Sequence, residues 1–173
     1  LNFQNLSINF EKIKLWKDTI INNLSSGIKS LAKQRQIKII NGKATFLSAD
    51  KLLVEDKQKK NININFLYCI IATGSSPSII NNLNINHPRI ISSTKALSLN
   101  KIPKKMLVIG GGYIGLELGT AYSSFGSKVT IAEFFPKLLS MADQDLVNPL
   151  YENLKNKFEQ IYLSTEVKDL KPN

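Results

Sequence analysis

The stretch from Lys105 to Glu133 constrains the fold of this chain more than any other part of the sequence. It opens with the short apolar run Met106–Ile109, which is typical of a buried strand. Gly110, Gly112 and Gly115 follow as G-x-G-x-x-G, and a helical pattern begins at once. A strand, a glycine turn and a helix in this order predict the first half of a βαβ unit.

Each glycine of this motif has a separate expected role. Gly110 permits the tight turn out of the strand, Gly112 lets the backbone approach a pyrophosphate, and Gly115 lets the helix lie close to the sheet. Gly111, Gly115 and Gly119 recur at every fourth position, which predicts a nearly bare helix face against the strands. We expect Gly126 to end the helix in a left-handed conformation. The predicted apolar side of the helix consists of Ile114, Leu118, Ala121, Tyr122 and Phe125.

An acidic residue follows at the distance that a dinucleotide site requires. A second apolar strand, Val129–Ala132, is followed by Glu133, about 20 residues beyond the glycines. A carboxylate there accepts hydrogen bonds from both ribose hydroxyls of adenosine and would repel a 2′-phosphate, so the pattern favours NAD over NADP. The phosphates would bind free N–H groups at the positive end of the helix. The alternative is a glycine-rich turn in an ordinary βαβ unit.

The composition excludes several classes of function. The net charge is +10, with 13 basic and 5 acidic residues in Leu1–Ser92 but 10 and 8 in the remainder. The lysines are scattered, and no basic stripe alternates with aromatic residues, so we do not expect nucleic-acid binding. The sequence shows no signal peptide and no apolar run that could cross a bilayer, so we expect no membrane association. The single cysteine, Cys69, indicates a reducing compartment, and we expect a cytoplasmic protein.

The first third of the chain has the periodicity of a long helix. Asn9 is a plausible cap and Glu11 lies in the first turn. Apolar residues then recur at steps of three or four over about 25 residues, namely Ile13, Trp16, Ile20, Leu24, Ile28 and Leu31. We expect this stripe to lie in a core or in a seam between helices, with a helix on a membrane surface as the weaker alternative.

Short strands are predicted after this helix. Ile37–Ile40, Ala44–Leu47, Leu52–Glu55 and the alternation of Ile62, Ile64 and Phe66 predict a small antiparallel sheet. Tyr68–Ala72 is a continuous apolar run that predicts a strand buried on both faces, with Cys69 packed inside it. Thr73, Gly74 and Ser75 follow, and offer hydroxyls and N–H groups to an anionic ligand. Near the other end, Asp143 is expected to cap a further helix, and Pro149, which falls within its pattern, should kink this helix or shift its start.

These motifs, in this order, resemble the pyridine-nucleotide flavin-disulfide oxidoreductases over essentially the whole chain. The residues that carry the resemblance are Asn41–Phe46, Ala72–Ser75, Ser92–Leu97 and the run from Ile102 to Glu133. The resemblance implies an α/β, Rossmann-like, three-layer FAD/NAD(P)-binding fold. Residues 1–92 would form the C-terminal part of an FAD-binding domain, and residues 93–173 the first part of an NAD-binding domain.

By this resemblance, FAD and NAD are the expected cofactors. The backbone at Ala44, together with Thr73, Gly74 and Ser75, would contact FAD. Glu117 would lie near the nicotinamide, and Tyr113 would either gate the nicotinamide pocket or simply be a half-exposed aromatic residue. The full set expected to bind NAD is Gly110, Gly111, Gly112, Tyr113, Ile114, Gly115, Leu116, Glu117 and Glu133.

The sequence departs from the family in three places. The first G-x-G-x-x-G, the redox C-x₄-C pair and the C-terminal His-x₄-Glu are all absent. We therefore interpret the chain as an internal fragment that contains no catalytic residues and does not catalyse alone. The resemblance is strongest to members that oxidise dihydrolipoyl groups through a disulfide and FAD to NAD⁺, which act as homodimers in 2-oxoacid dehydrogenase complexes. The alternatives are a member with another disulfide substrate, a non-catalytic truncated remnant, and an adaptor that docks through the long helix.

Overall fold

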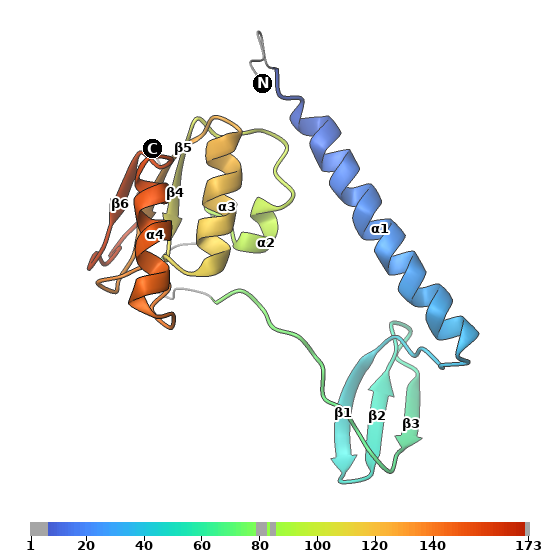
Figure 1. The fold of residues 1–173 in the computed structure, drawn as a ribbon. Coiled ribbons are helices and arrows are strands. Elements are labelled where there is room, and N and C mark those ends of the chain that lie inside the picture. Colours follow the sequence, from blue (N-terminus) through green and yellow to red (C-terminus); the bar gives the residue numbers. More distant parts are fainter. Residues whose placement is uncertain (1–6, 79–82, 84–85, 172–173) are drawn as a thin grey trace. The chain divides into compact units, whose positions relative to one another are not determined.

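The computed structural model describes residues 7–78, 83 and 86–171, and the chain divides into two compact units (Figure 1). Trp16–Ser76 forms one, called the sheet unit below. Leu1–Leu15 together with Pro77–Asn173 forms the other, called the βαβ unit. The predicted division at residues 92 and 93 concerns which cofactor each part would bind, and it stays a prediction.

A parallel sheet with the strand order β4-β5-β6 is the centre of the βαβ unit. The strands are β4 (Lys105–Ile109), β5 (Lys128–Ala132) and β6 (Gln160–Tyr162). The helices α3 (Tyr113–Ser124) and α4 (Gln144–Lys155) connect them in turn. The predicted alternation of strand and helix is therefore confirmed from Met106 onward.

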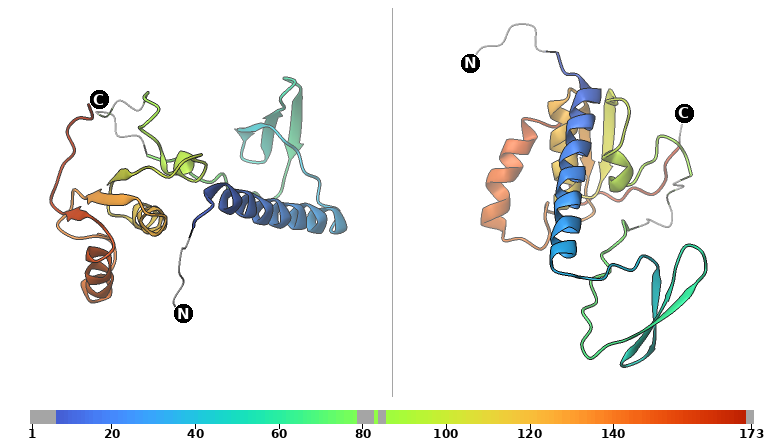
Figure 2. Two further views of the ribbon diagram at one scale, coloured as in Figure 1. Left: turned by 90° about the horizontal axis from the view of Figure 1, so that it is seen from above. Right: turned by 90° about the vertical axis from the view of Figure 1, so that its right-hand side faces the viewer.

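Helices α3 and α4 pack on the side of this sheet where the core lies (Figures 1 and 2). Val108, Ile131 and Ile161 are in register across the three strands and contribute to this core. The largest fully buried side chains are Ile131, Leu138, Leu154, Val129 and Val147. The α/β class is confirmed, whereas the third layer of the expected fold is not among the described residues and stays a prediction.

The predicted apolar side of α3 is only partly correct. Leu116, Gly119 and Tyr122 are the buried residues, whereas Ile114 is 45% exposed. The glycine face lies closest to the strands, as expected, because a Cβ at Gly119 would lie 3.3 Å from Val129 Cγ1. Hydrophobicity identifies apolar side chains, but the helix comes closest to the strands at glycines, which have no side chain. Gly126 ends the helix with φ +96°, which confirms its predicted role.

Tyr122 joins α3 to the short helix α2 (Ser93–Ala96). Its buried hydroxyl donates a hydrogen bond of 2.6 Å to the carbonyl oxygen of Ala96. Burial also raises the pKa of the Tyr122 phenol above 10.0. The ring contacts Phe10, at a centroid distance of 6.2 Å, and Phe125, at 6.0 Å. This aromatic cluster fixes the first residues of the long helix α1 (Phe10–Gln34) to the βαβ unit.

Helix α4 begins where the sequence predicts. Asp143 occupies the N-cap position, but its side chain makes no capping hydrogen bond. Val147 and Leu154 are buried, and the helix continues past Pro149 to Lys155. Pro149 therefore does not shift the start of the helix.

Helix α1 has the predicted length and cap. It contains 25 residues, and the Asn9 side chain accepts a hydrogen bond of 3.0 Å from the Lys12 N–H. No residue of α1 is buried, however. Trp16, Leu24 and Ile28 are 67%, 65% and 70% exposed, so the prediction that the apolar stripe lies in a core is wrong for the described part of the chain.

An antiparallel sheet with the order β1-β2-β3 forms the rest of the sheet unit's regular structure. The strands are β1 (Lys43–Ser48), β2 (Lys51–Glu55) and β3 (Asn61–Asn65), as predicted. Phe46 pairs with Leu52, which pairs with Ile64, so the same face of all three strands is apolar. Val54 on this face is buried, and β1 is exposed along its whole length.

Two predicted strands do not form. Ile37–Ile40 has no ladder partner, and Ile37 and Ile39 are 58% and 59% exposed. Tyr68–Ala72 is irregular rather than a buried strand, with Tyr68 and Ile70 more than 90% exposed, and Cys69 is exposed instead of packed. A strand that is buried on both faces needs a sheet to pair with and a packed layer on each face, and neither sheet of the described residues includes this segment.

The Tyr122 hydrogen bond generates a prediction about stability. Replacing Tyr122 by Phe leaves the Ala96 carbonyl buried without its donor, so the free energy of unfolding should fall by about 1–3 kcal/mol. Urea unfolding followed by circular dichroism measures this. Tyr162→Phe is the control, because that ring is half exposed in β6. Equal stability of wild type and Tyr122→Phe would contradict the assignment.

The raised pKa of Tyr122 also predicts a dependence on pH. Because the folded-state pKa lies above the unfolded value of 10.0, the unfolded state loses its proton first as the pH rises. The stabilising effect of the hydroxyl should be complete below pH 10.0 and decline as the pH rises through the folded-state pKa. The difference in unfolding free energy between wild type and Tyr122→Phe should therefore shrink in alkaline solution, and a constant difference would contradict this.

Candidate functional site

The glycine loop between β4 and α3 has the geometry that the motif predicts. Gly110 has φ +105°, a region that favours glycine, and its N–H donates a hydrogen bond of 2.9 Å to the Ala132 carbonyl. A Cβ at Gly115 would lie 2.5 Å from the Gly110 carbonyl oxygen and 3.0 Å from Val108 Cγ1. The first turn of α3 therefore rests directly on the end of β4, which confirms the structural role expected of Gly115.

The amino end of α3 is open toward solvent. Gly112 is the N-cap residue, with extended backbone and no side-chain capping bond. Among the described residues, the N–H groups of Gly112, Tyr113 and Ile114 have no acceptor. A Cβ at Gly112 would meet no atom within 4 Å. This combination of free donors and open space suits a phosphate group at the positive end of a helix.

Glu133 lies against this loop. It follows β5 directly and is 7% exposed. Its Oε2 accepts a hydrogen bond from the Gly111 N–H, and its Oε1 accepts one of 2.7 Å from the Phe135 N–H. A carboxylate has about four acceptor positions, so two remain for hydroxyl donors. The acidic side chain therefore faces the glycine loop and does not point away from it.

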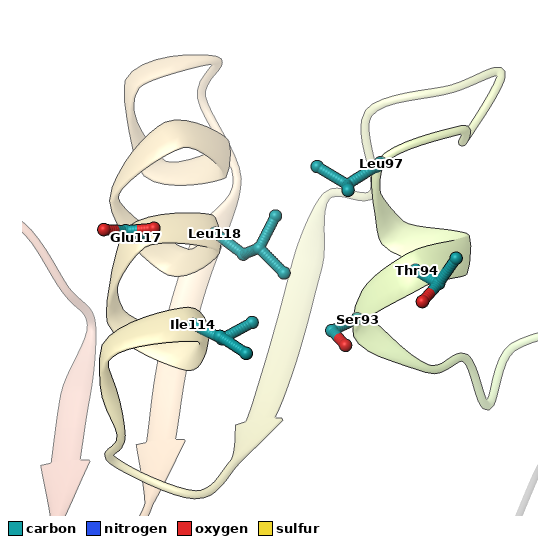
Figure 3. A pocket seen from close by; sticks show the side chains of 6 residues that line it. All are labelled: Ser93, Thr94, Leu97, Ile114, Glu117 and Leu118. Atoms are coloured by element: carbon teal, nitrogen blue, oxygen red, sulfur yellow. The ribbon is translucent and has the colours of Figure 1, made fainter. Parts of the chain in front are cut away.

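A shallow hollow of about 450 Å³ lies between α2 and α3 (Figure 3). Ile114 and Leu118 extend from α3 toward α2. Glu117 also belongs to the lining, although its carboxylate lies on the side of α3 that faces away from α2. Among the described residues, the lining consists of Ser93, Thr94, Leu97, Ile114, Glu117 and Leu118. Two of the residues predicted to bind NAD, Ile114 and Glu117, are thus brought to one surface.

The other predicted NAD residues differ in exposure. Tyr113 begins α3 and is 67% exposed, so its ring is accessible at the mouth of the helix. Leu116 is 5% exposed and belongs to the hydrophobic core. Its side chain has a packing role, and only its backbone lies near the helix start.

The residues predicted to contact FAD are all in the sheet unit. Ala44 is exposed in β1. Thr73, Gly74 and Ser75 are exposed in an irregular stretch, where Gly74 has φ +71°. In the described residues of this unit, these four positions form no cradle that would hold a dinucleotide, so their role stays a prediction.

Sequence reasoning missed the segment that follows Glu133. Leu138 contacts the glycine loop from the core, and the Leu139 N–H donates a hydrogen bond of 3.0 Å to the Gly111 carbonyl. Ser93 and Thr94 were also not identified as lining residues. No motif marks these positions, because they act through tertiary packing.

Two further kinds of site have no support in the described residues. There, no group of three or more His, Cys, Asp or Glu side chains is placed to hold a metal ion. Within the same residues, no helix combines the length and apolar character needed to span a bilayer.

Comparison with known proteins gives a consistent family. The model of the pyridine nucleotide-disulphide oxidoreductase family matches residues 3–173. The chain is 39% identical over 156 residues to the dihydrolipoyl dehydrogenase of Vibrio parahaemolyticus, covering 90% of this chain and 32% of that protein. It is 41% identical over 163 residues to the one of Buchnera aphidicola, covering 94% and 34%. The chain thus spans about a third of the curated relatives that it matches.

Solved structures agree with this result. The HOCl-induced flavoprotein disulfide reductase RclA from Escherichia coli matches with a TM-score of 0.80 and 29% identity, covering 94% of this chain and 37% of that chain. Its Cu(II) complex matches with a TM-score of 0.82 and 26% identity, covering 95% and 38%.

The family model extends over nearly all of the sequence, and both kinds of relative agree with it. This family consists of flavoprotein disulfide reductases that depend on FAD and NAD(P). We conclude that the chain belongs to the pyridine nucleotide-disulphide oxidoreductase family.

Proposed function

We propose that this chain is the middle part of an NAD-dependent flavoprotein disulfide oxidoreductase, and that the whole enzyme is a dihydrolipoyl dehydrogenase. Identities of 39% and 41% to curated dihydrolipoyl dehydrogenases support the substrate class. The geometry of the glycine loop supports the share of the reaction that this chain would perform. That share is to bind NAD and to hold its nicotinamide end.

The observation that carries the proposal is the position of the Glu133 carboxylate. It lies beside the glycine loop, held by the N–H groups of Gly111 and Phe135. A carboxylate held there would accept the 2′- and 3′-hydroxyls of an adenosine ribose and repel a 2′-phosphate. The site therefore favours NAD over NADP.

Around this anchor, the remaining residues have complementary roles. The free N–H groups of Gly112, Tyr113 and Ile114 would donate to the diphosphate. Ile114 and Glu117, from the first turns of the same helix, line the hollow, which would receive the nicotinamide end. Tyr113, exposed at the mouth, would cover or release that end.

The bound cofactors would supply hydride transfer between the reduced flavin and NAD⁺. The chain has one cysteine and one histidine, so it cannot itself provide the family's redox cysteine pair together with its His-x₄-Glu segment. Ala44, Thr73, Gly74 and Ser75 would contact FAD only together with parts of the enzyme that are not in this sequence. Oxidation of the dithiol is therefore a property of the whole enzyme.

The partners follow from the same proposal. The whole enzyme would be a cytoplasmic homodimer that serves the lipoyl domains of a 2-oxoacid dehydrogenase complex. Similarity to dihydrolipoyl dehydrogenases supports this assignment. The +10 charge lies mainly in the first 92 residues as scattered lysines, and we assign no nucleic-acid or membrane partner to it.

A second candidate has support of its own. The match to RclA favours a family member that reduces or oxidises a different substrate. The continuous reading frame distinguishes the candidates. A C-x₄-C motif upstream and His-x₄-Glu downstream support an enzyme, and dihydrolipoamide turnover identifies its substrate. A stop codon at either border would instead indicate a truncated, non-catalytic remnant.

The proposed role of Glu133 predicts a change in coenzyme preference. Titration calorimetry of the chain should show tighter binding of NADH than of NADPH. Glu133→Gln removes the charge at nearly constant volume, so the NADH binding free energy should weaken by about 1–3 kcal/mol, or roughly 5- to 150-fold in Kd. The ratio of the Kd for NADPH to the Kd for NADH should also become smaller in this variant.

Glu152→Gln is the matched control, because Glu152 lies on the exposed surface of α4, away from the glycine loop. It should bind NADH as the wild type does. Unchanged affinity and preference in Glu133→Gln would remove Glu133 from the site.

The exposure of the residues proposed to contact FAD predicts a property of the purified chain. Ala44, Thr73, Gly74 and Ser75 are exposed, and the sequence contains one G-x-G-x-x-G, which lies in the βαβ unit. We therefore expect the chain alone to be purified without the visible absorption band of oxidised flavin. A yellow preparation that releases FAD on heating would contradict this.

A further inference from the structure

The second residue of the glycine run, Gly111, is restricted by its neighbours rather than by its own backbone. The motif G-x-G-x-x-G leaves this position free. In the structure, a Cβ at Gly111 would lie 2.6 Å from Leu138 Cδ2, 3.0 Å from Glu133 Oε2 and 3.2 Å from Glu133 Cβ. Its φ is outside the left-handed region, so the chain conformation alone would accept a side chain.

Leu138 cannot easily make room. It is 1% exposed and belongs to the hydrophobic core. The N–H of the next residue, Leu139, donates a hydrogen bond of 3.0 Å to the Gly111 carbonyl and so connects this segment to the glycine loop. The Leu139 carbonyl in turn accepts a hydrogen bond of 2.7 Å from the Ala142 N–H, so a turn within this segment also holds Leu139 in place.

Both backbone groups of Gly111 are therefore already used. Its N–H donates to Glu133 Oε2, and its carbonyl accepts from Leu139. The next residues are different, because Gly112 and Tyr113 have N–H groups without an acceptor in the described part of the chain. A phosphate at the amino end of α3 would therefore accept hydrogen bonds from the N–H groups of Gly112 and the residues after it.

From this arrangement we infer that Gly111 is a positioning residue and does not itself bind phosphate. Leu138 and Glu133 form a clamp that holds Gly111 in place, so that the N–H groups of Gly112 and the residues after it stay directed at the diphosphate. The inference rests on the proposed NAD-binding function. It assigns Leu138, which no motif marks, as the second positioning residue of the same site.

Hydrogen exchange followed by NMR tests the clamp in the chain without a ligand. The Gly111 amide should exchange slowly, because the Glu133 carboxylate holds it, whereas the Gly112 and Tyr113 amides should exchange fast. Addition of NADH should slow exchange at Gly112 and Tyr113 and leave Gly111 unchanged. Exchange at Gly111 as fast as at Gly112 in the free chain would overturn the inference.

A double-mutant cycle tests the packing. Gly111→Ala should raise the Kd for NADH at least about tenfold and lower the urea midpoint, because the new methyl group displaces the loop. Leu138→Val removes the δ carbons but keeps a branched side chain in the core. In that background, Gly111→Ala should change the Kd by less than about threefold.

Gly112→Ala is the matched comparison. A Cβ there meets no atom within 4 Å, so the urea midpoint should fall less than in Gly111→Ala, by no more than the loss of a glycine N-cap, while NADH binding weakens at least about tenfold. An unchanged Kd and midpoint in Gly111→Ala, or an equal effect of that substitution in both backgrounds, would overturn the clamp. Failure of the wild type to bind NADH would instead overturn the proposed function, while the exchange of Gly111 and the midpoints still decide whether the clamp exists.

Discussion

The close approach of α3 to β4 is the constraint on which the βαβ unit depends. At Gly115, helix and strand meet backbone to backbone, since a Cβ there would lie 2.5 Å from the Gly110 carbonyl oxygen. At Gly119 the same helix face rests on Val129 and Phe158. Because the helix lies this close, its free N–H groups stand beside the carboxyl ends of the strands, where Glu133 leaves β5. A side chain at either glycine would move the helix outward and separate these two parts of the site.

Glu133 connects architecture and chemistry in one side chain. A carboxylate that is only 7% exposed needs hydrogen-bond donors, and the N–H groups of Gly111 and Phe135 supply them. The negative charge also lies near the positive end of α3, which stabilises it further. The residue that would recognise a ribose therefore also holds the glycine loop in place. Stability and coenzyme affinity must consequently be measured together for any change at this position.

The sequence was informative where structure depends on residues close together along the chain. The turn at Gly110, the end of α3 at Gly126 and the antiparallel pairing of β1, β2 and β3 all follow local patterns. The glycine face of α3 was predicted correctly, but on its apolar side Ile114 is exposed and Leu116, which was not predicted, is buried. Leu138 was missed because its contact with Gly111 depends on tertiary packing. Tyr68–Ala72 was expected as a buried strand, but a strand of that kind is defined by its neighbours, which the described residues do not provide.

The two expected cofactor sites consequently differ in what they require. All residues proposed for NAD lie in the βαβ unit, whose core is formed and whose glycine loop is held by hydrogen bonds. All residues proposed for FAD lie in the sheet unit, which leaves Trp16, Leu24 and Ile28 on α1 largely exposed, as well as Tyr68 and Ile70. Apolar surface on this scale is stabilised only when another surface covers it, at about 25 cal/mol per Å². The proposed FAD residues Thr73, Gly74 and Ser75 therefore lie in a stretch that the described residues leave exposed and irregular. The residues proposed for NAD, in contrast, are held by hydrogen bonds and packing within the βαβ unit itself.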